Sequence, residues 1–160
     1  METTIWKGNR RWSWVILVIV LGICTVIGIA LALRESVRIR EFKVDIFVLS
    51  SESSVCMAEG PDGLVRLSKE NQGAFYSLVE KTRGYFTLDD PQATESVTFK
   101  FNCHEQVWEL QVDRISEEKL RLHLTGTREY VVYVRDEGLY ADFVKLASLD
   151  SFNGANKKTG

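Results

Sequence analysis

The most pronounced pattern of apolar positions is the run Trp14–Leu33, which carries no charged residue and ends at Arg34. An α-helix rises about 1.5 Å per residue, so this run is long enough to cross the ~30 Å hydrocarbon core of a bilayer. Basic residues and tryptophans precede it, and such side chains are typical of the headgroup region. The pattern predicts an N-terminal basic tail over residues 1–12 and a transmembrane helix over residues 13–34.

The same run has an alternative interpretation as a cleaved secretory signal peptide. The basic start and Ala30-Leu31-Ala32 resemble a signal sequence with its small-residue cleavage site. Signal cores span about 7 to 15 apolar residues, so the length of this run favours a retained anchor. A lipidated cysteine needs a small residue before it, whereas Cys24 follows Ile23, which argues against a lipoprotein.

Basic residues near the membrane normally set the orientation of a span, and here they are nearly balanced. They lie before the run at Lys7, Arg10 and Arg11, and after it at Arg34, Arg38, Arg40 and Lys43. A first hydrophobic segment this close to the start is typical of an uncleaved signal anchor. We therefore expect a cell-membrane protein with a cytoplasmic N-terminus and an extracytoplasmic domain.

Beyond a juxtamembrane linker at residues 35–40, the polar and apolar pattern predicts one domain over residues 41–149. Its first apolar positions alternate at Phe42, Val44, Ile46 and Val48, and this period of two predicts a strand. A hairpin is predicted next, because Val55–Ala58 and Leu64–Leu67 flank a Gly-Pro-Asp-Gly turn.

A helix is predicted over Lys69–Arg83, with Ser68 as its N-cap and Gly84 suited to ending it. Its apolar residues fall at helical spacing, at Ala74, Phe75, Leu78 and Val79.

Four apolar-alternating segments then predict consecutive strands joined by short polar connections, the pattern of an antiparallel meander. Their apolar positions are Val97, Phe99, Phe101 and Cys103; Trp108, Leu110 and Val112; Leu120, Leu122 and Leu124; and Val131–Val134. A closing helix is predicted after Asp136 as its cap, with Leu139, Phe143, Leu146 and Ala147 on one face. The polar tail at residues 150–160 is predicted to be disordered.

Together these elements predict an α+β fold, in which a four-strand meander and N-terminal strands form an antiparallel sheet packed by two helices. An anchor, a turn ending in Gly63-Leu64-Val65, a helix, strands such as Val97-Thr98-Phe99-Lys100-Phe101 and a final helix follow one another. Over residues 44–149 this layout resembles small uncharacterised membrane-anchored or lipoprotein domains of Gram-positive bacteria. The resemblance implies the fold and no catalytic residues.

Charge narrows the choice of partners. Residues 35–160 carry 16 basic and 21 acidic side chains, a net charge of −5. An acidic domain repels a phosphate backbone, so we expect no nucleic-acid partner. The basic residues from Arg34 to Lys43 lie beside the predicted span, where anionic lipid headgroups are one partner and ordinary anchoring is the alternative.

The soluble part holds two cysteines, Cys56 and Cys103. In an oxidising compartment they allow one disulfide, which would close a long loop and contribute about 2–4 kcal/mol. The alternative is that both are small buried hydrophobic residues, as free cysteines commonly are.

Reactive side chains cluster only at Cys103-His104-Glu105, which lies in a predicted hairpin connection. Neighbouring residues of a strand point to opposite faces, which argues against a cysteine nucleophile with an adjacent base. The two histidines and the loop pair Asp89-Asp90 lack metal-ligand spacing, and His123 is expected to face outward. We therefore predict no catalytic residues, no cofactor and no metal site.

Two sets of residues are candidates for contacts with other proteins. Cys24, Gly28 and Ala32 are four residues apart, and small residues on one face of a membrane helix promote helix association. Aromatic side chains near the last strands form a candidate binding patch, with burial in the core as the alternative. They are Trp108, Tyr130, Tyr133 and Tyr140.

The leading functional hypothesis is a single-pass membrane protein with a non-enzymatic binding or regulatory domain outside the membrane. Its expected partners are the lipid bilayer and another membrane or extracytoplasmic protein. The alternative is an accessory subunit of a membrane complex that packs through its transmembrane helix. An enzyme with an unrecognised site is a third hypothesis, for which the sequence offers only Cys103 and His104.

Overall fold

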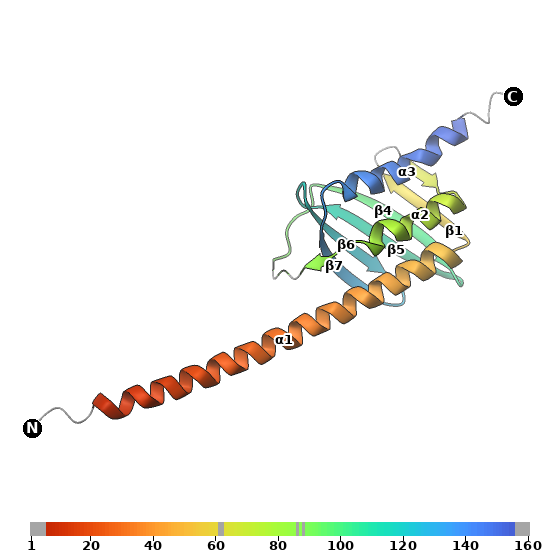
Figure 1. Cartoon of the computed structure of the whole chain (residues 1–160). Coiled ribbons are helices and arrows are strands. Elements are labelled where there is room, and N and C mark those ends of the chain that lie inside the picture. The colour runs from red at the N-terminus through yellow and green to blue at the C-terminus, as the bar shows by residue number, and fades with distance from the viewer. Residues whose placement is uncertain (1–5, 61–62, 86, 88, 156–160) are drawn as a thin grey trace, which may run out of the picture. The chain divides into compact units, whose positions relative to one another are not determined.

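The computed structural model describes residues 6–60, 63–85, 87 and 89–155, and the side chains of residues 12–59, 63–85, 87 and 89–148 within them. The helices are α1 (Trp6–Glu52), α2 (Lys69–Glu80) and α3 (Leu139–Ala155). The strands are β1 (Val55–Gly60), β2 (Gly63–Arg66), β3 (Gly84–Tyr85), β4 (Glu95–Cys103), β5 (Gln106–Arg114), β6 (Lys119–Thr125) and β7 (Glu129–Arg135). Helices combined with an antiparallel sheet confirm the predicted α+β class (Figure 1).

The chain divides into two compact units, residues 1–37 and residues 38–160. The first unit consists of the N-terminal part of α1, in which every side chain from Trp12 to Arg34 is exposed. This segment is apolar and long enough to cross a membrane. The helix already includes residues 6–12, where the sequence predicted a basic tail, while residues 1–5 lie outside the described residues.

The second unit begins within α1, and the predicted linker at residues 35–40 is part of this helix. The strand predicted from Phe42 is wrong, because these residues are helical. Phe42, Ile46 and Leu49 are all at most 2% exposed, and their spacing of four and three residues is that of one helix face. Val44 and Phe47 are exposed on the other side of the helix. Apolar residues four positions apart, at 42 and 46, fit both the helical period of 3.6 and the strand period of two. The apolar Val44 between them therefore suggested a strand wrongly.

The seven strands form one antiparallel sheet in the order β2-β1-β4-β5-β6-β7-β3. The predicted hairpin is β1 and β2, and the predicted meander is β4 to β7, with Val97 opposite Val112 and Leu122 opposite Val132. Pro61 and Asp62 of the predicted turn lie outside the described residues. The two-residue strand β3 was not predicted; it pairs with β7 and begins at Gly84, so Gly84 does not end the preceding helix as expected.

Helix α2 begins as predicted, because the Ser68 side chain accepts a hydrogen bond from the Asn71 N–H. Two lysines connect α2 to α1, one at each end of α2. Lys43 Nζ donates to the carbonyl oxygens of Glu80 and Thr82, 2.6 and 2.8 Å away, and Lys69 Nζ donates to the Ser53 carbonyl. Each ammonium thus satisfies carbonyl groups at the C-terminal end of the other helix, and the two helices run antiparallel.

The last helix presents the predicted face, with Leu139, Phe143, Leu146 and Ala147 all buried. Its predicted cap is wrong, because the helix begins at Leu139 and Gly138, whose φ is +90°, precedes it in place of Asp136. The helix continues to Ala155, through half of the tail predicted to be disordered, and residues 156–160 lie outside the described residues.

The core lies between the sheet and three helical segments, where two had been predicted. Phe75 of α2 packs edge-on against Phe99 and Phe101 of β4 at ring distances of 4.9 and 5.3 Å, and against Phe143 of α3 at 5.4 Å. Phe42 of α1 contacts Tyr130 of β7. Figure 1 shows α2 and α3 on the same face of the sheet. The other face of the sheet is therefore the one available for a functional site.

Candidate functional site: the outer face of the sheet

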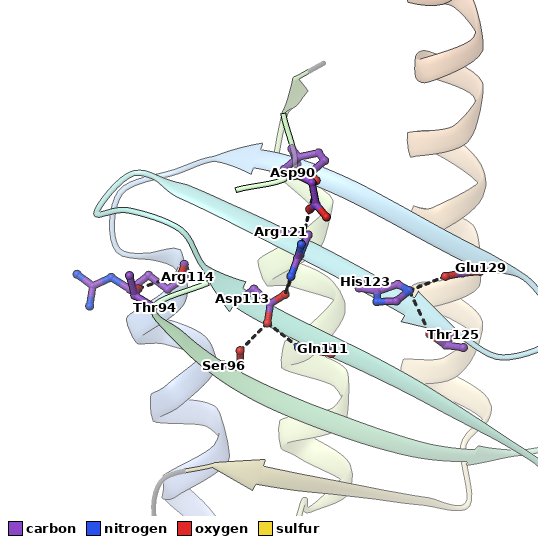
Figure 2. A network of polar contacts seen from close by, with 11 residues as sticks. Asp90, Thr94, Ser96, Gln111, Asp113, Arg114, Arg121, His123, Thr125 and Glu129 are labelled. Carbon is purple, nitrogen blue, oxygen red and sulfur yellow. Dashed lines mark hydrogen bonds and ion pairs between the residues drawn. The ribbon is translucent and has the colours of Figure 1, made fainter. Parts of the chain in front are cut away.

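The outer face is the sheet surface that points away from the core, and its residues alternate with core residues along each strand. On β5, Gln111 and Asp113 alternate with the buried Leu110 and Val112. The strand register brings Asp113 opposite Arg121 of β6, and Arg121 opposite Tyr133 of β7. A row of polar side chains therefore crosses three neighbouring strands, as Figure 2 shows for its first two members.

Asp113 is the centre of this row and is only 1% exposed. Its Oδ1 accepts hydrogen bonds from Ser96 Oγ at 2.6 Å and from Gln111 Nε2 at 2.8 Å. Its Oδ2 accepts a hydrogen bond from Arg121 Nε at 2.8 Å and forms an ion pair with Arg121 Nη2 at 2.7 Å. A buried carboxylate is costly unless it is paired and hydrogen-bonded, and here both oxygens are satisfied (Figure 2).

Arg121 extends the network to Asp90, in the segment that precedes β4. Its Nη1 binds Asp90 Oδ1, which also accepts a hydrogen bond from the Tyr133 hydroxyl at 3.1 Å. Burial acts to lower the pKa of Arg121, but the hydrogen bonds and charges of Asp113 and Asp90 raise it overall. Burial, with the hydrogen bond to Asp90, raises the pKa of Tyr133. The guanidinium is thus fixed between two carboxylates.

The segment carrying Asp90 is attached to the sheet a second time at Thr94. The Thr94 backbone N–H and side-chain hydroxyl both donate to the Arg114 carbonyl, at 2.8 and 3.0 Å. Residues 90–94 are therefore held at two points beside the outer face. Of the loop pair Asp89-Asp90, Asp90 is thus paired with Arg121.

Next to the network, the β7–β3 edge presents aromatic and cationic side chains. The rings of Tyr85 and Tyr133 lie 6.1 Å apart, and the Arg135 guanidinium lies 5.6 Å from the centre of the Tyr85 ring. Both tyrosines are half-buried and Arg135 is exposed. Burial raises the pKa of Tyr85, although the charge of Arg135 opposes this shift. Aromatic and arginine side chains are enriched at protein interfaces, so this edge has the composition of a contact surface.

The four aromatics predicted as a patch are not brought together. Trp108 and Tyr130 are 9% and 4% exposed and belong to the core. Tyr140 is half-buried on α3, where its ring lies 5.9 Å from the Arg114 guanidinium. Tyr133 alone of the four lies on the outer face, because it alternates with the buried Val132 and Val134. The alternative of core burial therefore holds for two of them.

His123 lies on the outer face as predicted, between Leu122 and Leu124, which are buried. Its Nε2 contacts Glu129 Oε1 at 2.8 Å and Thr125 Oγ1 at 3.4 Å (Figure 2). The His123–Glu129 pair is exposed and joins β6 to β7 across the hairpin.

Cys56 and Cys103 are free thiols in the structure, both buried on the core side of the sheet. Cys56 is opposite Phe101, so Cys103 lies two residues further along β4, a diagonal separation of about 7–8 Å. A disulfide needs Cα atoms within about 7 Å, and this register favours the alternative of buried thiols. Burial raises the pKa of Cys56 to about 12.

The small-residue face of the membrane-length segment is open in the structure. Cys24, Gly28 and Ala32 are all exposed, and no neighbouring atom lies within 4 Å of the position that a Cβ would take on Gly28. A second group of polar residues lies at the β4–β5 turn, where Glu52, Cys103 and His104 meet. The expectation that Cys103 and His104 point apart is wrong, since Cys103 Sγ lies 3.3 Å from His104 Nδ1.

No family model, no curated protein sequence and no solved structure matches the chain. The function is therefore argued from the geometry of the chain itself.

Asp113, Arg121 and Asp90 were missed by the sequence reasoning, although part of the signal was available. Asp113 and Arg121 are opposite charges placed almost symmetrically about the predicted connection at residues 116–119. Cross-strand pairing of opposite charges is a recognised stabilising contact. Asp90 had no such signal, because its loop reaches β6 only in the folded structure.

Proposed function

We propose that the chain is a single-pass membrane protein whose extracytoplasmic domain binds a protein partner through the outer face of its sheet. The observation that carries the proposal is the difference between the two faces. The inner face is buried under helices, whereas the outer face combines the Asp113–Arg121–Asp90 network with the Tyr85, Tyr133 and Arg135 edge. A fixed polar arrangement beside half-exposed aromatics is suited to recognition without chemistry.

The membrane part of the proposal rests on α1. Its segment from Trp12 to Arg34 is wholly exposed and apolar, and exposed apolar surface of this extent needs a lipid or protein environment. Basic side chains lie on both sides of the span. The extracytoplasmic orientation is the part of the proposal that needs a direct test, because the basic residues on the two sides of the span are nearly balanced.

Orientation is tested with an engineered cysteine, because Cys56 and Cys103 are buried and report poorly on accessibility. Thr127, in the exposed β6–β7 connection, is replaced in a Cys24→Ser background. We expect a membrane-impermeant maleimide to label Thr127→Cys in intact cells. Labelling only after lysis would place the domain in the cytoplasm and refute that part of the proposal.

Binding is tested by site-specific photocrosslinking in the membrane of the native cell. A photoreactive amino acid replaces Val131 on the outer face or, as the matched control, Ser77 on the exposed side of α2. We expect a discrete adduct from position 131 only, and expect Arg135→Glu to remove it. Equal adducts from both positions, or an adduct unaffected by Arg135→Glu, would contradict an outer-face interface.

A second candidate function is an accessory subunit of a membrane complex, supported by the exposed small residues that share one helix face at Cys24, Gly28 and Ala32. Close approach of helix backbones requires such small residues. Gly28→Ile should dissociate the complex on a native gel, whereas Gly22→Ile, on a different side of the helix, should not. Unchanged migration of the Gly28→Ile protein would reject this function.

A further inference from the structure

Glu52, Cys103 and His104 form a compact cluster where the end of α1 meets the β4–β5 turn. The Cys103 thiol lies 3.3 Å from Nδ1 of His104, and the other ring nitrogen, Nε2, lies 3.3 Å from Glu52 Oε2. One donor atom from each of the three residues lies within 4.8 Å of the other two. Among the described residues this is the one group of three His, Cys, Asp or Glu side chains with such spacing.

The backbone around the cluster is fixed by hydrogen bonds from both segments. Ser54 donates its N–H and its hydroxyl to the Asn102 carbonyl, at 2.9 and 3.1 Å, next to Cys103. Lys69 donates to the Ser53 carbonyl, next to Glu52. The C-terminus of α1 is therefore tied to the end of β4. The three side chains are brought together by the fold, although Glu52 and Cys103 lie far apart in the sequence.

The β4–β5 turn has an unusual conformation for its residues. His104 and Glu105 both have positive φ, 49° and 63°, and they are the only non-glycine residues of the described chain that do. Two-residue turns of this kind normally contain Asn, Asp or Gly, because other side chains are disfavoured in the left-handed region. The left-handed backbone moves the His104 ring out of strand alternation and beside the Cys103 thiol.

We propose that Glu52, Cys103 and His104 bind a divalent transition metal ion of the zinc class. A thiolate, an imidazole and a carboxylate are the donors that such ions take, and three protein ligands leave a fourth position open. Donors of a tetrahedral zinc site lie roughly 3.5 Å apart, given bonds of about 2.0–2.3 Å. The distance from Cys103 Sγ to His104 Nδ1, 3.3 Å, is already near this separation. Glu52 contacts the other ring nitrogen, so its exposed side chain turns toward Cys103 Sγ and Nδ1 to complete the site, from donor positions that lie within 4.8 Å of one another.

The exposure of the cluster suits a metal ion better than a substrate. The contacts run from thiol to imidazole to carboxylate, as in a nucleophile with its base, but Cys103 is only 4% exposed. A substrate carbonyl has no access to a thiol buried to this extent. His104 and Glu52 have side chains that are 72% and 52% exposed, so both can turn about an ion at the rim while Cys103 binds it from below.

The experiment is a titration of the full-length protein in detergent micelles with Co²⁺ and Zn²⁺ after treatment with a chelator. Co²⁺ reports on the donors, because a thiolate ligand gives a near-ultraviolet charge-transfer band and tetrahedral geometry gives visible bands. The variants are Cys103→Ser, His104→Asn and Glu52→Gln. The matched controls are Cys56→Ser, a buried thiol outside the cluster, and His123→Asn, the other histidine.

We expect the wild-type protein and both controls to show the Co²⁺ bands, and Zn²⁺ to displace Co²⁺ stoichiometrically. Cys103→Ser should abolish the charge-transfer band, and His104→Asn and Glu52→Gln should weaken binding by at least tenfold. Because asparagine suits the left-handed turn, His104→Asn should fold at least as stably as the wild type and keeps the test valid if Cys103→Ser does not fold. Absence of the bands in the wild type, or wild-type affinity in His104→Asn, would overturn the proposal.

Discussion

Removal of the Asp113 carboxylate should destabilise the domain more than any other single change on the outer face. Asp113→Ala deletes the acceptor of three hydrogen bonds and the partner of an ion pair, and leaves Ser96, Gln111 and Arg121 without that partner. Breaking a buried charged pair costs about 3–5 kcal/mol. Arg121 is 22% exposed and keeps Asp90, so solvent and the second carboxylate reduce the expected loss to about 2–4 kcal/mol.

The assay is thermal unfolding of the full chain in detergent micelles, followed by near-ultraviolet circular dichroism, which reports on packed aromatic side chains of the domain. For a domain of this size 1 kcal/mol corresponds to about 4 °C, so Asp113→Ala should lower the Tm by roughly 8–16 °C. Asp113→Asn keeps the shape and part of the hydrogen bonding, and should lower the Tm by less.

The matched control is Glu95→Gln, which removes a neighbouring cross-strand ion pair. Glu95 Oε2 lies 3.3 Å from Arg114 Nη1, and the two side chains are 55% and 36% exposed. Exposed pairs contribute about 0–1 kcal/mol, so the Tm should change by less than about 4 °C. If Asp113→Ala were as stable as Glu95→Gln, the network would not hold the outer face together, and the reasoning from burial would be refuted.

Three further predictions concern the inner side of the domain. Lys43→Met should lower the free energy of unfolding by about 1–2 kcal/mol, because two carbonyls at the end of α2 lose a charged donor. The measurement is the decrease in Tm. The control Lys81→Met, at an exposed lysine, should change the free energy of unfolding by no more than about 0.5 kcal/mol. Cys56 should resist maleimide at pH 7.5 until the protein unfolds. Its folded pKa of about 12 lies above the ordinary value of 9.0, so its contribution to the free energy of unfolding is full below pH 9 and is lost between pH 9 and 12. Cys56→Ala should therefore lessen the decrease in stability over this pH range. Gly126→Ala should lower the Tm, because the new Cβ would come within 2.3 Å of the Trp108 ring. Gly73→Ala, which has open space around it in α2, should raise the Tm by an amount equivalent to about 0.5–1 kcal/mol. A higher Tm for Gly126→Ala than for Gly73→Ala would contradict both arguments.

Local periodicity predicted the elements that bury one side and expose the other. The meander from Val97 to Val134 was predicted because apolar residues alternate in its first three strands and a short apolar run follows, and the register then follows from the short connections. The same reasoning failed at Phe42, where the apolar positions fit two periods and only the packing of Ile46 and Leu49 into the core decides between them. Strand β3 was missed because two residues carry no period.

The candidate sites depend more on tertiary structure than the fold does. The Asp113–Arg121 pair was within reach of cross-strand reasoning, but Asp90 joins it through a loop without a repeating pattern. Glu52 meets Cys103 and His104 only because α1 extends into the domain and ends beside the β4–β5 turn. The side chains of Cys103 and His104 were expected to point apart because strand geometry was assumed for both residues. His104 instead has a positive φ, which places its ring beside the thiol.

The final turns of α1 belong to the core, and this determines where the chain can be cut between its apolar segment and its domain. Phe42, Ile46 and Leu49 supply buried side chains, and Lys43 holds the end of α2. A protease that cuts just before Arg38 would release a unit with all of these residues, whereas a cut after Leu49 would remove one wall of the core and leave an unstable fragment. The few residues between Arg34 and Phe42 are therefore the place where cleavage yields a folded domain.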